Sequence, residues 1–197
     1  MFCEPRVNAC GFFLVFNRIL RVFLSGIKAT TLQQLAENLE LWQRIVGAVA
    51  SLVSEPVPFL ERLGQIPVVS SRATRCLGLY VSRGDVPVCI RLQYAQEVDS
   101  LPKTFLHEVA HACEHLSRKP GRRRPRAHGS EWRRWARELA IEPVRTGESA
   151  ALKELHERRL KLVAVCRTCG FEFYRVRRLN RTRSYTHRHC GGMLDLL

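Results

Sequence analysis

The chain has no long uninterrupted run of apolar residues. The apolar run from Gly11 to Phe16 is short, and Asn17, Arg18 and Arg21 interrupt the segment after it. A membrane-spanning helix needs about 20 apolar residues, and a signal peptide needs a basic start before an apolar core. We therefore expect no secretion signal and no stable membrane insertion. We expect a cytoplasmic protein, associated with the nucleoid if it is bacterial.

Acidic residues are scarce beside basic ones. The chain has 18 Asp and Glu against 32 Lys and Arg, a formal net charge of +14. Residues 1–100 carry 10 basic and 8 acidic side chains, a net charge of +2, whereas residues 101–197 carry 22 and 10, a net charge of +12. This asymmetry favours a polyanionic partner, most commonly nucleic acid, over a surface that is merely solvated.

The eight cysteines lack the secretory context in which they would form disulfides. In a reducing compartment, closely spaced thiols serve as metal ligands, and isolated ones behave as small apolar residues. We expect the cysteines near the C-terminus to bind metal and the scattered ones to pack in the core.

Three short runs rich in β-forming residues predict a small antiparallel sheet. They span residues 66–69, 76–81 and 88–92, and the segment Ser82–Asp85 is typical of a hairpin turn. Pro56 and Pro58 are expected to end the helical region that precedes the strands.

Apolar residues at helical spacing predict helices on both sides of these strands, and together they indicate an α+β fold. In the helix expected at 131–141, the buried stripe comprises Trp132, Trp135, Ala136, Leu139 and Ala140. The expected helices span residues 11–25, 31–53 (capped by Thr31), 101–116 (capped by Ser100), 131–141 (capped by Ser130) and 148–160.

The sequence His107-Glu108-Val109-Ala110-His111 falls within the helix expected at 101–116. Positions i and i+4 lie about 40° apart, one turn along the same helix face, so both imidazoles can reach one metal ion. Glu108 lies beside them and can act as a general base without being a ligand. This pattern predicts a catalytic zinc site.

A catalytic zinc site takes three protein ligands and keeps one position open. The candidates for the third ligand are His115, His128, Glu131 and Glu138. His115 would extend an almost linear array along one helix, whereas His128 precedes the next helix and can approach from another direction. We favour His128, with His115 second and the two glutamates as weaker alternatives.

A second metal-binding pattern lies near the C-terminus. Cys166-x-x-Cys169 and His187-x-x-Cys190 are separated by 17 residues, and a glycine follows each pair. Paired ligands followed by glycine form a knuckle, and two knuckles close a tetrahedral zinc site. We expect a structural zinc here, because four protein ligands leave no open position. His189 is a less well spaced substitute for His187.

Arginines alternate with aromatic residues between the two knuckles, which predicts a hairpin with arginines on one face. Arginines bind phosphates and aromatic rings stack on unpaired bases, so we expect salt-sensitive, sequence-tolerant binding of nucleic acid, DNA foremost. Docking of this segment on its own catalytic domain is the alternative. For the basic loop 118–126, three roles stay open: a lid, a further DNA contact or a protease-sensitive linker. The candidate nucleic-acid-binding residues are Arg122, Arg123, Arg124, Arg126, Arg175, Arg177, Arg178, Arg181 and Arg183.

Taken together, these motifs resemble the SprT-like metallopeptidase family. The resemblance rests on the His-Glu-x-x-His helix, the basic loop, the segment that begins at His128, and the C-terminal ribbon, and it covers the chain from about residue 60 onward. It implies a minimal zincin-like fold in which His107, His111 and His128 bind zinc and Glu108 is the general base. The family includes bacterial SprT and the Spartan protease, which degrades proteins crosslinked to DNA.

The second knuckle departs from the family, whose members usually have a cysteine where His187 stands, but three cysteines and one histidine still make an ordinary zinc site. The resemblance leaves activity open, so the alternative is a non-catalytic nucleic-acid-binding protein or a transcription or repair adaptor with structural zinc. The expected segments are an N-terminal helical region (1–58), an SprT-like zincin core (59–147), a helical connector (148–162) and a zinc ribbon (163–197).

Overall fold

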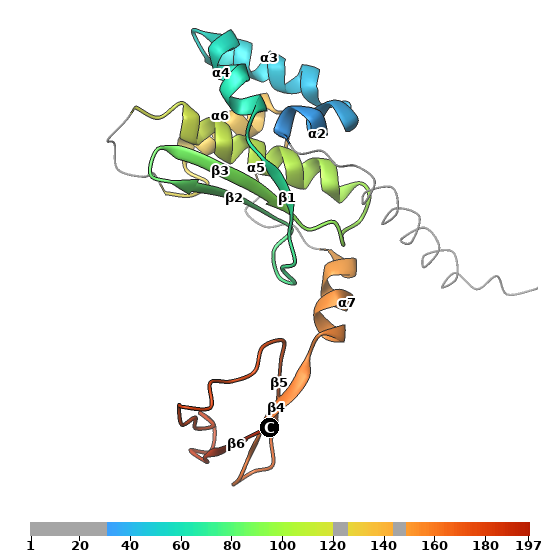
Figure 1. Cartoon of the computed structure of the whole chain (residues 1–197), viewed down its shortest axis with the longest axis vertical. Helices are drawn as coiled ribbons and strands as arrows, with labels where there is room; N and C mark the ends of the chain where they lie inside the picture. Colours follow the sequence, from blue (N-terminus) through green and yellow to red (C-terminus); the bar gives the residue numbers. More distant parts are fainter. Residues whose placement is uncertain (1–30, 120–125, 144–148) are drawn as a thin grey trace, which may run out of the picture. The chain divides into compact units, whose positions relative to one another are not determined.

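The computed structural model describes residues 31–119, 126–143 and 149–197. The chain divides into two compact units, Met1–Ser149 and Ala150–Leu197, each with helix and strand, so the α+β prediction is confirmed (Figure 1). The helix expected at 11–25 lies outside the described residues, as do the candidate residues Arg122, Arg123 and Arg124.

From Thr31 onward, where the described residues begin, three helices precede the sheet of the first unit. The single helix expected at 31–53 is wrong, because the chain turns after Asn38, where Glu40 adopts a left-handed backbone conformation with φ of 57°. Thr31 is a cap as predicted, since its hydroxyl accepts a hydrogen bond from the backbone N–H of Gln34. The three helices are α2 (Leu32–Asn38), α3 (Trp42–Leu52) and α4 (Pro56–Gly64).

The prolines that were expected to end this region instead begin α4. Pro56 is its first residue, and Pro58 also lies in its first turn. The first N–H groups of a helix have no partner within the helix, so a proline there costs no hydrogen bond, and its fixed φ suits the helix. The same residue type therefore starts a helix at this position.

The sheet of the first unit has the strand order β1-β3-β2 and is mixed. The hairpin between β2 and β3 is antiparallel as predicted, and Gly84 in its turn has φ of 58°. The prediction of an all-antiparallel sheet is wrong, because β1 runs parallel to β3. The third strand inserts between the first two instead of extending a meander. The strands are β1 (Val68–Ser70), β2 (Gly78–Arg83) and β3 (Val86–Leu92).

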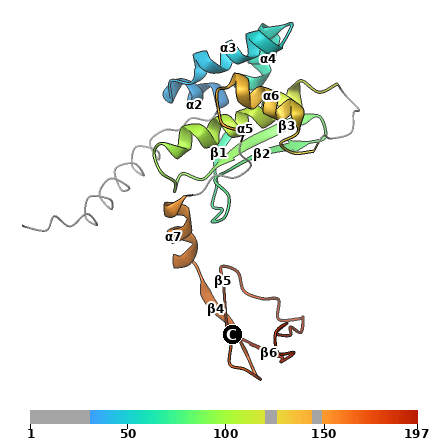
Figure 2. The same ribbon diagram turned by 180° about the vertical axis from the view of Figure 1, so that it is seen from behind.

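Helix α5 (Ser100–Leu116) packs on the sheet through β2 and β3, with α4 and α6 (Ser130–Glu138) on its other sides (Figures 1 and 2). Ser100 and Ser130 are the first residues of these helices and not their caps, which are Asp99 and Gly129. Trp132 is fully buried as expected, whereas Ala140 is exposed, so its place in the predicted stripe is wrong.

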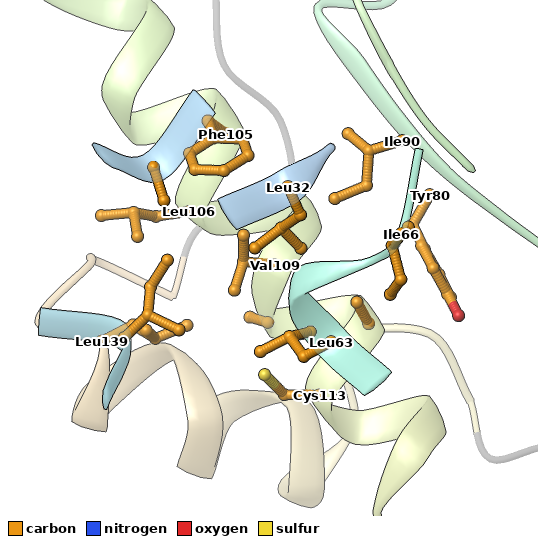
Figure 3. Packing of buried hydrophobic residues seen from close by; sticks show 14 of the residues in the cluster. Leu32, Leu63, Ile66, Tyr80, Ile90, Phe105, Leu106, Val109, Cys113 and Leu139 are labelled. Atoms are coloured by element: carbon orange, nitrogen blue, oxygen red, sulfur yellow. The ribbon is translucent and has the colours of Figure 1, made fainter. Parts of the chain in front are cut away.

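The core of the first unit joins all of these elements. Leu32, Leu63, Ile90 and Val109 come from α2, α4, β3 and α5 and gather in one cluster of buried side chains (Figure 3). Burial of this apolar surface holds α5 in place, so the helices at 32–64 share a core with the helix that carries the histidines. In the part of the chain that the structure describes, no helix is long and apolar enough to cross a membrane.

The second unit contains a helix and a three-stranded antiparallel sheet of order β5-β4-β6. The helix expected at 148–160 is confirmed as α7. The predicted arginine hairpin is wrong, because β5 ends at Arg175 and residues 176–185, which follow it, are irregular and mostly exposed. The division into four segments stays a prediction. The elements are α7 (Ala150–Arg158), β4 (Lys161–Cys166), β5 (Glu172–Arg175) and β6 (Leu194–Leu196).

Candidate metal centres

Three histidine side chains converge in the first unit. His107 and His111 come from α5, and His128 comes from the turn that leads into α6. Nε2 of His128 lies 3.0 Å from Nε2 of His107 and 3.1 Å from Nε2 of His111. The structure therefore brings together the three residues that we favoured as ligands of the catalytic metal.

These distances suit a single zinc ion. Zinc binds imidazole nitrogen at about 2.0–2.1 Å in tetrahedral geometry, which places two ligand nitrogens about 3.3 Å apart. A hydrogen on Nε2 of His128 can point at only one of its two neighbours, whereas one cation can accept a lone pair from each of the three rings. The arrangement suits a metal better than it suits a hydrogen-bonded triplet.

The surroundings of His107 favour its neutral imidazole, the form that binds metal. Burial is the main cause that lowers the pKa of His107 to about 4, and the nearby His111 and His128 lower it further. On the far side of His111, the carboxylate oxygen Oε2 of Glu114 lies 3.8 Å from Nδ1. A carboxylate on that side favours the tautomer that leaves Nε2 available to a metal.

The turn before α6 holds His128 in an uncommon conformation. His128 has φ of 59°, in the left-handed region that few residues other than glycine adopt. The next residue, Gly129, donates its backbone N–H to the carbonyl of Arg126 at 3.0 Å, and a Cβ on Gly129 would lie 2.9 Å from that same oxygen. Glycine is therefore needed for the tight turn that directs His128 toward α5.

Glu108 is buried next to the histidines, with 6% of its surface exposed. Its Oε2 accepts a hydrogen bond of 2.6 Å from the backbone N–H of Tyr80 on β2. Burial raises the pKa of Glu108 to about 7, against the opposing influence of His111 and of that N–H. A carboxyl group with a pKa near 7 is suited to take up and release a proton at neutral pH.

Gly78 makes room for this carboxylate, a role that its place in the sequence did not predict. A Cβ on Gly78 would lie 2.7 Å from Oε1 of Glu108 and 2.8 Å from its Cγ, closer than real Cβ atoms approach. The pattern of residues 76–81 indicated only a strand. A glycine inside a strand often marks a close approach by another group, and this was the available signal.

The other candidates for the third ligand lie outside the cluster. Nε2 of His115 donates to the carbonyl of Gly84 at 3.0 Å, and its Nδ1 lies 2.6 Å from the hydroxyl of Tyr80. His115 thus ties the hairpin turn to the end of α5. Glu131 and Glu138 are exposed on α6 and do not join the three histidines.

Residues 58–151 match the family model described as the SprT-like family. The chain carries an SprT-like domain. The match runs from α4 into α7 and includes the three clustered histidines and Glu108. The SprT-like family is metallopeptidase-related, in agreement with the metallopeptidase-like domain that the motif on α5 predicts. No curated protein and no solved structure matches the chain.

A second cluster of possible metal ligands lies beyond the residues of the SprT-like match. Sγ of Cys190 lies 3.4 Å from Sγ of Cys166, 3.5 Å from Sγ of Cys169 and 3.3 Å from Nδ1 of His187. Backbone N–H groups, that of Cys169 foremost, lower the pKa of the Cys166 thiol to about 6, which favours the thiolate that metals bind. His187, and not His189, belongs to this set.

The two knuckles of this cluster repeat the same backbone pattern. Gly170 donates to the carbonyl of Cys166 at 2.9 Å, and Gly191 donates to the carbonyl of His187 at 2.8 Å. Both glycines have φ of 70°, the left-handed conformation that closes such a turn. A Cβ on Gly192 would lie 2.7 Å from Sγ of Cys166. The backbone is thus shaped to bring the four side chains together.

The candidate nucleic-acid residues that the structure describes are all exposed. Residues 161–197 hold eight basic and two acidic side chains, a net charge of +6. In the same unit, the exposed ring of Phe171 stacks on His187 with centroids 5.1 Å apart. The role of these residues in nucleic-acid binding stays a prediction. The exposed arginines are Arg126, Arg175, Arg177, Arg178, Arg181 and Arg183.

Proposed function

We propose that this protein is a zinc-dependent metallopeptidase of SprT-like type, with a minimal zincin-like domain, that cleaves proteins bound or crosslinked to DNA. The observation that carries this proposal is the convergence of three imidazole Nε2 atoms beside a buried carboxylate. His107, His111 and His128 hold the catalytic zinc and leave one of its positions open. Cys166, Cys169, His187 and Cys190 hold a structural zinc.

Each residue of the site has a distinct role in this proposal. A bound zinc ion polarises the scissile carbonyl and makes water a better nucleophile at neutral pH. Glu108 accepts the proton of the attacking water and passes it to the leaving amine, for which its raised pKa is suited. The N–H of Tyr80 fixes one carboxylate oxygen, so the other oxygen is the one available for the proton.

The basic charge of the second unit supports a DNA partner. Its exposed arginines can neutralise phosphates without reading bases, so the same site accepts many sequences. DNA then serves to bring the protease to its protein substrates. A nucleic-acid-binding adaptor without catalysis is the second candidate, and the same exposed arginines favour it.

The substitution Glu108→Gln separates the two candidates. It keeps the size of the side chain and the hydrogen bond from Tyr80 but removes the base, so we expect zinc to stay bound and cleavage to fall by at least about 10²-fold. The measurement is cleavage of a DNA-binding protein by metal-quantified full-length protein, with single-stranded DNA, with duplex DNA and without DNA.

Glu131→Gln is the matched control, because it makes the same chemical change at an exposed carboxylate outside the cluster. We expect it to cleave at the rate of the wild type. Equal cleavage by wild type and Glu108→Gln would remove the peptidase proposal, and absence of cleavage by the wild type in all three conditions would favour the adaptor.

A further inference from the structure

A single indole contacts all three clustered histidines. Trp132 lies on α6 and is fully buried. Its ring centroid lies 4.8 Å from that of His107, 5.4 Å from that of His111 and 4.6 Å from that of His128. The imidazoles come from two separate segments of the chain, and the indole of Trp132 contacts the rings from both.

The other tryptophan of α6 packs elsewhere. Trp135 is also buried, but it stacks on Phe59 of α4, with ring centroids 5.8 Å apart and planes inclined by 10°. One indole of the helix therefore joins α6 to the helical part of the core, and the other forms a wall of the histidine cluster.

The contribution of Trp132 does not come from a hydrogen bond. Within the described residues, its indole Nε1 is buried and has no hydrogen-bond partner. A buried donor without a partner destabilises the folded protein, a cost that a purely apolar side chain would not carry. What tryptophan adds at this position is therefore a large aromatic ring that contacts all three imidazoles, inclined by 54° and 33° to those of His107 and His111 and edge-on, at 84°, to that of His128.

The contact with the indole matters because an imidazole ring rotates easily about the terminal torsion of its side chain. The terminal torsion of a histidine side chain has broad minima, so neighbouring groups decide which way the ring points. The indole restricts the rotation of His107, His111 and His128 at once and keeps their Nε2 atoms directed at one point. Groups that orient metal ligands in this way contribute substantially to metal affinity.

We propose that Trp132 is the positioning residue of the histidine site, holding the three imidazoles in the orientation that binds one metal ion. This rests on the proposed function, since it takes those imidazoles to be ligands of one metal. The contact of one side chain with all three rings carries the inference, and Trp135 of the same helix shows no ring contact with them.

The test is a cobalt(II) titration of metal-free full-length protein, with a competing chelator to measure affinity. The ribbon site gives a thiolate-to-cobalt charge-transfer band, whereas the histidine site has no sulfur ligand, so the spectra separate the two sites. The variants are Trp132→Phe and Trp132→Leu, with Trp135→Leu as the matched control because it truncates the other buried indole of α6.

We expect Trp132→Leu to raise the cobalt dissociation constant of the histidine site by about 10–100-fold and to change its d–d bands. Trp132→Phe, which keeps a smaller flat ring, should fall between Leu and the wild type. Trp135→Leu should lower the melting temperature of the metal-free protein but leave the cobalt affinity and the d–d bands as in the wild type.

Wild-type affinity and an unchanged spectrum in Trp132→Leu would overturn the inference. If Trp132→Leu does not fold, Trp132→Phe decides alone, and an unchanged affinity and spectrum there would overturn it equally. A wild type that binds cobalt only at the ribbon would instead overturn the proposed function. The two failures are therefore distinguishable.

Discussion

At the scale of single residues, Glu108 occupies a space that β2 leaves open for it. The backbone N–H of Tyr80 fixes one of its oxygens, and the absent side chain of Gly78 admits the other. The position of the carboxylate relative to the histidines therefore depends on a strand that contributes no reactive group of its own.

We expect Gly78→Ala to lower kcat by on the order of 10²-fold while the zinc content stays unchanged. The added methyl group would displace Glu108, and a shift of about 1 Å in a reacting group has an effect of this size. The measurement is steady-state cleavage together with zinc analysis of the same sample.

Gly47→Ala provides the control for this substitution. Gly47 lies inside α3, where a Cβ would meet nothing within 4 Å. Alanine at such a helix position should stabilise the protein by about 0.5–1 kcal/mol and leave cleavage unaffected. If Gly78→Ala cleaves as fast as Gly47→Ala, the strand does not position the base.

The sequence predicted which residues meet at the site but not how they are held. Ligand spacing and the direction of approach pointed to His128, but its left-handed backbone depends on the turn with Arg126, which no periodicity reveals. Trp132 was foreseen only as part of a buried stripe. An apolar side chain that packs on core and one that packs on histidines have the same sequence signature.

At the scale of elements, the helix that carries the histidines was predictable, since its apolar spacing and its sequence limits both indicated residues 101–116. The sequence did not predict the start of α4 at Pro56 or the parallel pairing of β1 with β3. A proline fits both the end and the first turn of a helix, and the order of strands depends on packing between distant segments.

In the C-terminal ribbon, residues 163–197, local features were again predictable and the pairing of strands was not. Its two knuckles follow from local spacing of ligands and glycines, and the structure repeats one hydrogen-bond pattern in both. The arginine segment between them was expected to be a hairpin, but it has little apolar surface to bury, and alternation alone did not produce paired strands beyond Arg175.

We expect the double variant Arg177→Ser and Arg178→Ser to weaken binding of single-stranded DNA for unrelated sequences alike. Loss of two phosphate contacts should also reduce the slope of log affinity against log salt by about 1.4. The measurement is fluorescence anisotropy with two labelled oligonucleotides of different sequence over a range of salt concentrations.

Lys153→Ser with Arg158→Ser removes the same charge from α7 of the same unit and serves as the comparison. We expect this pair to retain the affinity and salt slope of the wild type. Equal losses in both double variants would mean that binding depends on total charge and not on the arginine segment.

At the scale of the whole molecule, the chain combines two units, and the described residues of each contain one cluster of possible metal ligands. The first cluster has three histidines and Glu108 beside it, as a catalytic site requires, and the second has four ligands, as a structural site requires. The basic charge is concentrated in the second half of the sequence. These features support the proposed function, in which a polyanion presents protein substrates to the protease.

The central claim is that His107, His111 and His128 together bind one zinc ion, and the zinc content of purified full-length protein tests it most directly. We expect about two zinc ions per chain in the wild type, about one in His128→Ala and about one in Cys166→Ser. A wild type with a single zinc ion, or a His128→Ala variant that keeps the wild-type content, would contradict the claim.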